Sequence, residues 1–272
     1  MTSSLRTVSR NYLSHIRDVI KTKRTRDRER VFVLEAAKPI LELLQSASQQ
    51  VVCVVVAPSF LERQPLEVRN HILSSGCTIH SCPEHTLAQL SDVETPSGVL
   101  AIVHQPNWNQ AAVLAQPRIF GRYGDMLQDP GNIGTIIRTA AGLNVSALWL
   151  APHSVDVFNP KVVRATAGAL FQLPIFSHTS LDELLNLDCV LMAADAAADE
   201  RSVPIRSIQT IPARTIVAIG GESRGLSEPV LNAATVRFTI PLKQGVESLN
   251  AAAAAAIAIF HLSDLPLDRA TA

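Results

Sequence analysis

Three segments of the C-terminal half combine glycine, polar side chains and the start of a helix. They read QDPGNIGTIIR, GGESRGLS and PLKQGVESLN. Glycine lets a backbone approach a ligand closely, and the free amides of such a loop can bind polar ligand atoms. The first two segments also supply charged side chains, Arg138 and Glu222, that could stabilise charge in a reaction. Together the segments favour a binding site for a polar ligand.

Each segment also has a purely structural interpretation. Asn132, Ser227 and Ser248 stand where a helix N-cap is expected. Arg138 could lie on the solvated face of its helix, opposite a stripe of isoleucines and alanines at helical spacing. Neither the GxGxxG fingerprint nor a Walker lysine is present, which disfavours an ordinary nucleotide-dependent α/β enzyme such as an oxidoreductase. Capping and ligand binding both stay open at this point.

The three segments lie in a region that alternates apolar strands with helices, from RIFGRYGDML to SLNAAAAAAIAIF. This alternation predicts a mostly parallel sheet with helices on both faces. Ligands of such folds collect at the carboxyl ends of the strands, in the loops that enter helices. We therefore expect the three segments to converge there.

The N-terminal part of the chain shows a second, smaller α/β pattern. It predicts a helix over residues 5–24, a strand at VFVLE, a helix at AAKPILELLQSA and a buried strand at VVCVVVA. The polar stretch PNWNQAAVLAQP has little periodicity and is interpreted as a linker. The predicted organisation is one domain over residues 1–105, a linker over 106–116 and a second domain over 117–272.

Charge is distributed unevenly along the 272 residues. The chain has 24 basic and 24 acidic side chains, but residues 1–30 hold nine basic against three acidic ones. A basic N-terminus predicts contact with a polyanion, although ion pairs along a solvated helix explain the same pattern. The run AAAAAAIAIF is too short for a membrane span, and the four cysteines lack metal-ligand or disulfide spacing. We expect a soluble, cytoplasmic protein with no metal site and no targeting segment.

The order of the motifs resembles that of one family. The chain carries Asn132-x-Gly134-x-x-x-Arg138, then Gly220-x-Glu222-x-x-Gly225, then Ile240-Pro241 with Ser248-Leu249-Asn250. These are similar to the three motifs of the SpoU (TrmH-like) branch of the SPOUT RNA methyltransferases. Residues 159–175 and the stretches ETPSGVLAIV and RDRERVFVLEAAKPILELL resemble further segments of the family, so the likeness covers nearly the whole chain.

The resemblance implies an α/β fold with a C-terminal trefoil-knot domain, preceded by a smaller ribosomal-protein-like domain that binds RNA. It implies S-adenosylmethionine as the cofactor, bound near Gly220, Ile240 and Leu249, and a homodimer whose active site combines residues of both subunits. The implied reaction is methyl transfer to a ribose 2′-hydroxyl of structured RNA, with ribosomal RNA favoured. The alternatives are a tRNA 2′-O-methyltransferase and a non-catalytic RNA-binding assembly factor with the same fold.

The resemblance also implies five catalytic residues: Arg138, Asn132, Glu222, Ser248 and Asn250. The family assigns the motif-one arginine, here Arg138, to activation of the hydroxyl. Because a guanidinium stays protonated in proteins, we expect Arg138 to hold the adjacent phosphate and to stabilise the developing alkoxide. The other four would orient Arg138, the ribose and the loops, with Glu222 as the charged partner of Arg138.

Overall fold

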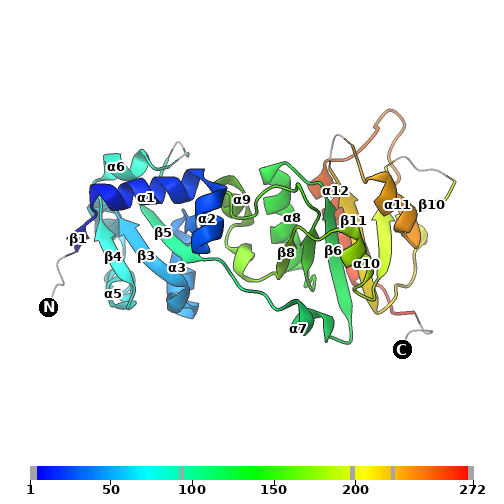
Figure 1. Ribbon diagram of the computed structural model, residues 1–272, viewed down its shortest axis with the longest axis horizontal. Helices are drawn as coiled ribbons and strands as arrows, with labels where there is room; N and C mark the ends of the chain where they lie inside the picture. The colour runs from blue at the N-terminus through cyan, green and yellow to red at the C-terminus, as the bar shows by residue number, and fades with distance from the viewer. Residues whose placement is uncertain (1–4, 92, 94, 197–199, 222–223, 269–272) are drawn as a thin grey trace. The chain divides into compact units, whose positions relative to one another are not determined.

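The computed structural model describes residues 5–91, 93, 95–196, 200–221 and 224–268. The chain packs into two compact units, Met1–Pro106 with Phe158–Ala167, and Asn107–Val157 with Gly168–Ala272 (Figure 1). The chain therefore enters the second unit at Asn107, returns to the first unit for the short segment Phe158–Ala167, and then forms the rest of the second unit. The predicted functional domains, 1–105 and 117–272, stay a prediction.

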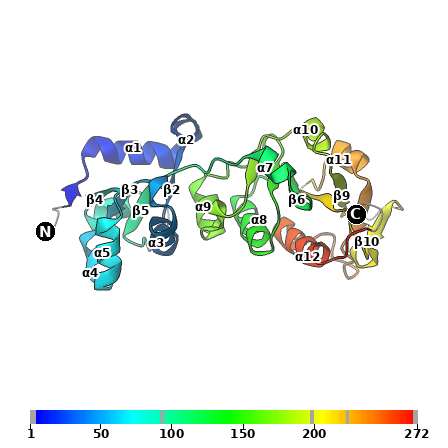
Figure 2. The same cartoon turned by 90° about the horizontal axis from the view of Figure 1, so that it is seen from below.

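The first unit contains a mixed sheet of order β1-β4-β3-β5-β2, in which β1, β4 and β3 are parallel and β5 is antiparallel to β3 and β2. Helix α1 runs along one face, and α3, α4 and α5 lie on the other (Figure 2). Its elements are β1 (Arg6–Thr7), α1 (Arg10–Lys21), α2 (Lys23–Glu29), β2 (Val31–Leu34), α3 (Ala37–Ser46), η1 (Ser48–Gln50), β3 (Val51–Val56), α4 (Pro58–Arg63), α5 (Leu66–Ser74), β4 (Thr78–Ser81), α6 (Glu84–Ala88), β5 (Val99–His104) and α9 (Pro160–Thr166).

The helix predicted over residues 5–24 begins later and is divided in the structure. Ser9 caps α1, because its hydroxyl oxygen accepts a hydrogen bond from the Tyr12 N–H at 3.2 Å. The chain is extended at Thr22, and α2 follows. The guanidinium of Arg26 then donates to the carbonyls of Val19 and Ile20 at 2.8 and 2.9 Å. The last carbonyls of a helix have no partner within it, so Arg26 satisfies the end of α1.

The second unit contains a sheet whose described strand pairs are all parallel, in the order β10-β12-β9-β11-β6-β7-β8. This confirms the predicted parallel α/β sheet. Its elements are α7 (Gln110–Leu114), β6 (Ile119–Asp125), α8 (Pro130–Gly142), β7 (Leu148–Leu150), η2 (Ala169–Phe171), β8 (Ile175–Ser177), α10 (Leu181–Leu185), β9 (Val190–Ala194), β10 (Ser202–Pro204), η3 (Ile205–Ser207), β11 (Arg214–Gly220), α11 (Glu228–Ala233), β12 (Val236–Thr239) and α12 (Ala251–Ser263).

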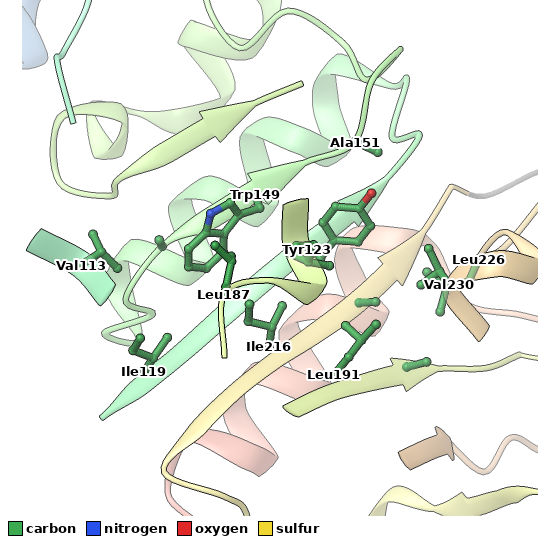
Figure 3. Packing of buried hydrophobic residues seen from close by; sticks show 14 residues of the cluster. Val113, Ile119, Tyr123, Trp149, Ala151, Leu187, Leu191, Ile216, Leu226 and Val230 are labelled. Carbon is green, nitrogen blue, oxygen red and sulfur yellow. The ribbon is translucent and has the colours of Figure 1, made fainter. Parts of the chain in front are cut away.

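Helices cover both faces of this second sheet. Helices α8 and α12 pack side by side on one face, and α7, α10 and α11 lie on the other (Figure 2). The core under the latter three is centred on Trp149, Tyr123 and Ile216 (Figure 3). The Trp149 indole Nε1 donates to Gln110 Oε1 at 3.0 Å, and Val113 is buried in the same core. Most of the stretch interpreted as a linker is therefore packed against the second unit.

None of the helices in the described part of the chain is both long and apolar enough to span a bilayer.

Candidate active site

The second and third segments meet at a cavity beside the carboxyl ends of β11 and β12. The cavity is lined by Gly220, Ile240, Ser248 and Leu249, together with other residues of the same loops. The first segment follows β6, which pairs with β11 so that Gly220 lies opposite Asp125. The structure thus brings the three expected cofactor-binding residues and Ser248 to one place.

The loop after β11 folds back onto its own strand. The Gly225 N–H donates to the Gly221 carbonyl at 2.8 Å, and Gly225 has a positive φ of 64°. A Cβ atom at Gly220 would collide with the backbone of Gly225 and Leu226. Position 220 therefore accepts only glycine in this loop conformation, and the close approach leaves backbone groups as part of the cavity wall.

A hydrogen bond joins the first segment to the third. Asn250 Nδ2 donates to Asn132 Oδ1 at 2.9 Å, although the two residues are 118 positions apart in the chain. Asn250 Oδ1 also accepts from the N–H groups of Ala252 and Ala253, at 3.0 and 3.2 Å. One side chain therefore caps α12 and fixes the Asn132 amide beside the cavity.

Of the three capping residues expected from the sequence, Asn132 and Ser248 do not cap their helices, and Ser227 holds its N-cap position without a side-chain bond. Asp129 caps α8, because its Oδ1 accepts from the Asn132 N–H at 2.8 Å, which leaves the Asn132 side chain for Asn250. Asn250, not Ser248, caps α12. Ser227 does hold the N-cap position of α11, but its side chain makes no capping bond, and its N–H donates to Asp125 Oδ2 at 2.7 Å.

Arg138 lies apart from the two asparagines. The predicted apolar stripe of α8 is buried at Ile133, Ile136, Ile137 and Ala140, whereas Arg138 is exposed on the opposite side. It makes no hydrogen bond or ion pair with any residue that the structure describes. Within one chain it is a solvated helix residue. Glu222, its expected partner, lies outside the described residues.

Two buried aspartates at strand ends were not predicted. Asp125, 4% exposed, ends β6 and fixes the start of α11 through Ser227. Burial, with a smaller contribution from the Asp125 charge, raises the pKa of Tyr123 to about 12. Asp195, 7% exposed, follows β9 and lines the cavity. An aspartate directly after an apolar strand is the sequence signal that could have found Asp195, since ligands bind at such strand ends.

Among the residues that the structure describes, there is no group of three or more histidine, cysteine, aspartate or glutamate side chains that could hold a metal ion.

Comparison with known proteins decides the family. The family model of the SpoU rRNA methylases matches residues 124–260, and that of the MRM3-like substrate-binding domain matches residues 15–101. The chain belongs to the SpoU rRNA methylase family. This confirms the family predicted from the three motifs, the methyltransferase class and the substrate-binding domain that precedes the catalytic part.

Relatives and solved structures agree with this membership. The chain is 26% identical to the 23S rRNA (guanosine(2553)-2′-O)-methyltransferase RlmP of Bacillus subtilis, over 89% of this chain and 92% of that protein. It is 35% identical to an uncharacterized tRNA/rRNA methyltransferase of Synechocystis, over 74% of this chain and 72% of that protein. An AdoMet-bound rRNA methyltransferase from Sinorhizobium meliloti has the same fold, with a TM-score of 0.80 at 24% identity, covering 94% and 95% of the two chains.

S-adenosylmethionine is the methyl donor of this family, as the motifs predicted. The residues of the cavity fit such a ligand. Apolar side chains such as Ile219, Phe238 and Leu249 line its walls together with Asp195, and the glycine loop brings its backbone close to the cavity.

Proposed function

We propose that this chain methylates a ribose 2′-hydroxyl of ribosomal RNA as a homodimer with a trefoil-knotted cofactor site. The observation that carries the proposal is the hydrogen bond between Asn132 and Asn250 beside the cavity that Gly220, Ile240 and Leu249 line. Loops after β9, β11 and β12 contribute to that cavity, which is compatible with a knot among them. Ribosomal RNA is favoured over transfer RNA because two of the similar proteins, RlmP and the human mitochondrial rRNA methyltransferase 3, are named as rRNA methyltransferases.

S-adenosylmethionine supplies an electrophilic methyl group when bound, and the chain must position the ribose hydroxyl and accept the charge that develops on it. Asn132 and Asn250, fixed by their mutual hydrogen bond, orient the hydroxyl and the neighbouring loops. Arg138 holds the adjacent phosphate and stabilises the developing alkoxide with its guanidinium, and an oxygen of that phosphate accepts the proton that the hydroxyl loses. Ser248, which lines the cavity, adds a hydroxyl to the same site.

Arg138 is exposed and has no hydrogen bond or ion pair with a described residue of its own chain. This supports an active site in which a second subunit lies next to Arg138. Helix α12, which packs beside α8, exposes two large apolar side chains, Ile257 at 41% and Phe260 at 69%. Such side chains on a helix that otherwise faces the core are typical of a surface that another protein covers. We therefore place the subunit interface on α12, next to the helix that carries Arg138.

The first unit supplies cations for RNA. Within KTKRTRDRER, Arg26 is buried, while Lys23 pairs with Asp27 and Arg28 with Glu29, each at 2.6 Å. Exposed cations without an ion pair to any described residue are Lys21, Arg24 and Arg30. The ion-pair interpretation therefore holds for Lys23 and Arg28, and we assign the three cations without an ion pair to phosphate contacts.

The test is to map 2′-O-methyl groups in the RNA of cells with and without the gene. We expect one or a few ribosomal RNA sites to lose the methyl group, and to regain it with the wild-type gene but not with one encoding Arg138→Ala. Loss confined to a transfer RNA would establish the tRNA alternative. Unchanged methylation of all RNA, with a defect in ribosome assembly, would establish the assembly factor.

A further inference from the structure

Each of the three motif segments carries one exposed cation: Arg138, Arg224 and Lys243. None of these charged groups has an ion pair or hydrogen bond with a residue that the structure describes. A ribose within an RNA strand has one phosphate on its 5′ side and one on its 3′ side. Arg138 is assigned to only one of them, so the second phosphate arrives at the same site and needs a cation of its own.

Lys243 begins a tight turn at the edge of the cofactor cavity. The Val246 N–H donates to the Lys243 carbonyl at 3.1 Å, and Gly245 has a positive φ of 92°. A bond between the first and fourth residues, with glycine in third place, is typical of a type II turn. Leu242 and Glu247, on either side of the turn, line the cavity. The edge of the cavity therefore carries Lys243 on a backbone of defined shape.

The same turn is open to solvent. Residues 241–248 are all exposed, and Figure 1 shows the loop between β12 and α12 projecting beyond the neighbouring helices. Two of its exposed side chains are large and apolar, Leu242 at 37% and Val246 at 51%. A cation between exposed apolar side chains matches a nucleotide, which combines a charged phosphate with the apolar face of a base.

We infer that the turn of residues 243–246 holds the target nucleotide of the RNA. The Lys243 ammonium binds a phosphate beside the ribose that is methylated, and Val246 packs against the base. Lys243 and Arg138 then hold the phosphates on the two sides of the ribose, which fixes its 2′-hydroxyl for attack on the methyl group. This inference rests on the proposed function, because it takes RNA as the substrate, and it assigns the residues that position that substrate.

The first test measures RNA binding by the full-length chain, with ribosomal RNA from cells that lack the gene as the probe. Lys243→Gln should weaken binding about fivefold and reduce the slope of log affinity against log salt by about 1, because one phosphate contact is lost. Lys243→Arg keeps the charge and should keep the slope. The matched control is Lys38→Gln, at an exposed lysine of α3 outside the cavity, which should bind as the wild type does.

The second test separates the apolar contact from the charge. Val246→Ser should weaken RNA binding about threefold with an unchanged salt slope, because it removes apolar area and no charge. Its control is Val203→Ser, at a 41% exposed position of β10 outside the cavity, which should match the wild type. Calorimetry with S-adenosylmethionine should give the wild-type affinity for every variant, since neither Lys243 nor Val246 lines the cavity.

The third test locates the contact on the RNA. The photoreactive amino acid p-benzoylphenylalanine, placed at position 243, should cross-link to the nucleotide that the wild type methylates or to one of its two neighbours. The same amino acid at position 38 should cross-link to neither of these sites.

Three results would overturn the inference. The first is wild-type RNA affinity and salt slope in Lys243→Gln. The second is a loss of S-adenosylmethionine affinity in Lys243→Gln or Val246→Ser, which would assign the turn to the cofactor. The third is a cross-link from position 243 to distant nucleotides or to a second copy of the chain. A wild-type chain that binds S-adenosylmethionine and methylates no RNA would instead contradict the proposed function itself.

Discussion

Asn250 has two tasks that one substitution separates. Its Oδ1 caps α12, and its Nδ2 donates to Asn132. Asn250→Ser keeps a good capping oxygen but cannot reach Asn132, so we expect the free energy of unfolding to stay within about 1 kcal/mol of the wild type. Methyl transfer should fall at least tenfold, because the Asn132 amide is no longer held. Denaturant unfolding and initial rates with RNA measure the two effects.

Asn109→Ser is the matched control for this substitution. Asn109 caps α7 through its Oδ1, which accepts from the Ala112 N–H at 3.2 Å, and it lies outside the cavity. Its replacement should leave both stability and rate almost unchanged. A wild-type rate in Asn250→Ser would remove the asparagine pair from the mechanism.

Arg138 is exposed on α8, so its replacement should not disturb folding. Arg138→Ala should bind S-adenosylmethionine normally and lose about 10²-fold in turnover, the scale for one preorganised charge-stabilising group. Arg138→Lys should recover little, because an ammonium cannot reproduce a planar fork on phosphate oxygens. The measurements are calorimetry for the cofactor and single-turnover methylation, with Arg206→Ala as the exposed-arginine control. Near-native turnover in Arg138→Ala would show that Arg138 is a solvated helix residue in the dimer too and has no role in catalysis.

At the scale of elements, α2 carries two arginines with opposite roles. Arg24 is exposed without an ion pair to any described residue, and Arg26 is buried against the end of α1. Arg24→Ala should keep the wild-type stability, weaken RNA binding and reduce the slope of log affinity against log salt by about 1. Arg26→Ala should instead cost about 1–3 kcal/mol of stability, because two carbonyls lose their partner. Salt titrations measure RNA binding, and thermal unfolding measures stability. A loss of stability in Arg24→Ala together with a weaker RNA affinity in a stable Arg26→Ala chain would exchange the two roles.

Strand β6 contains an unusual buried cation. Arg122 is 1% exposed, and none of its three guanidinium nitrogens has a hydrogen-bond partner among the described residues; its Cζ lies 5.2 Å from the centroid of the Phe120 ring. Desolvation by burial lowers its pKa to about 9. Replacing such a charge with an apolar side chain of similar size should stabilise the fold, so Arg122→Met should gain about 1–4 kcal/mol.

The stabilisation expected for Arg122→Met depends on pH, because burial lowers the pKa of Arg122. Below about pH 9 the arginine is charged in both states, and the folded state bears the full cost of burial. Unlike a solvated guanidinium such as that of Arg138, which stays protonated, the buried guanidinium of Arg122 loses its proton in the folded state above about pH 9 while the unfolded state keeps it, so the wild type recovers stability. The advantage of Arg122→Met, measured by urea unfolding, should therefore shrink between pH 8 and roughly pH 10.5. A less stable Arg122→Met chain would show that the guanidinium has a partner that stabilises it.

At the scale of the whole molecule, the proposed homodimer depends on the exposed side of α12. Phe260→Glu places a charge where the second copy would bury an aromatic ring, and the variant should still fold because Phe260 is 69% exposed. Light scattering should give twice the 29.3 kDa chain mass for the wild type and 29.3 kDa for the variant, with methylation lost. Leu66→Glu, at a 68% exposed position of α5, is the control that should remain dimeric and active. A dimeric Phe260→Glu chain would place the interface elsewhere.

The elements of the second unit were predictable because their pattern is local. Strands of a parallel sheet are buried on both faces, so they form continuous apolar runs, and the stripe of α8 repeats at helical spacing. Residues for the cavity were identified by the motifs, and Gly220, Ile240, Ser248 and Leu249 do line it.

Local patterns could not predict which of several suitable residues caps a helix, or where a helix breaks. Asp129 and Asn132 are both good caps in one turn, and packing left Asn132 to bond Asn250. The break at Thr22 coincides with the return of Arg26 to the end of α1, a contact between residues of two helices.

The sequence by itself therefore determined the family, the element types and the motif residues, since these depend on neighbouring residues and on resemblance. The tertiary structure decided which distant side chains meet: Asn132 with Asn250, Asp125 with Ser227, and helix α9 with the first unit. The physical reason is that the order of strands in a sheet brings together residues far apart in the chain, and no local pattern of side chains encodes that order.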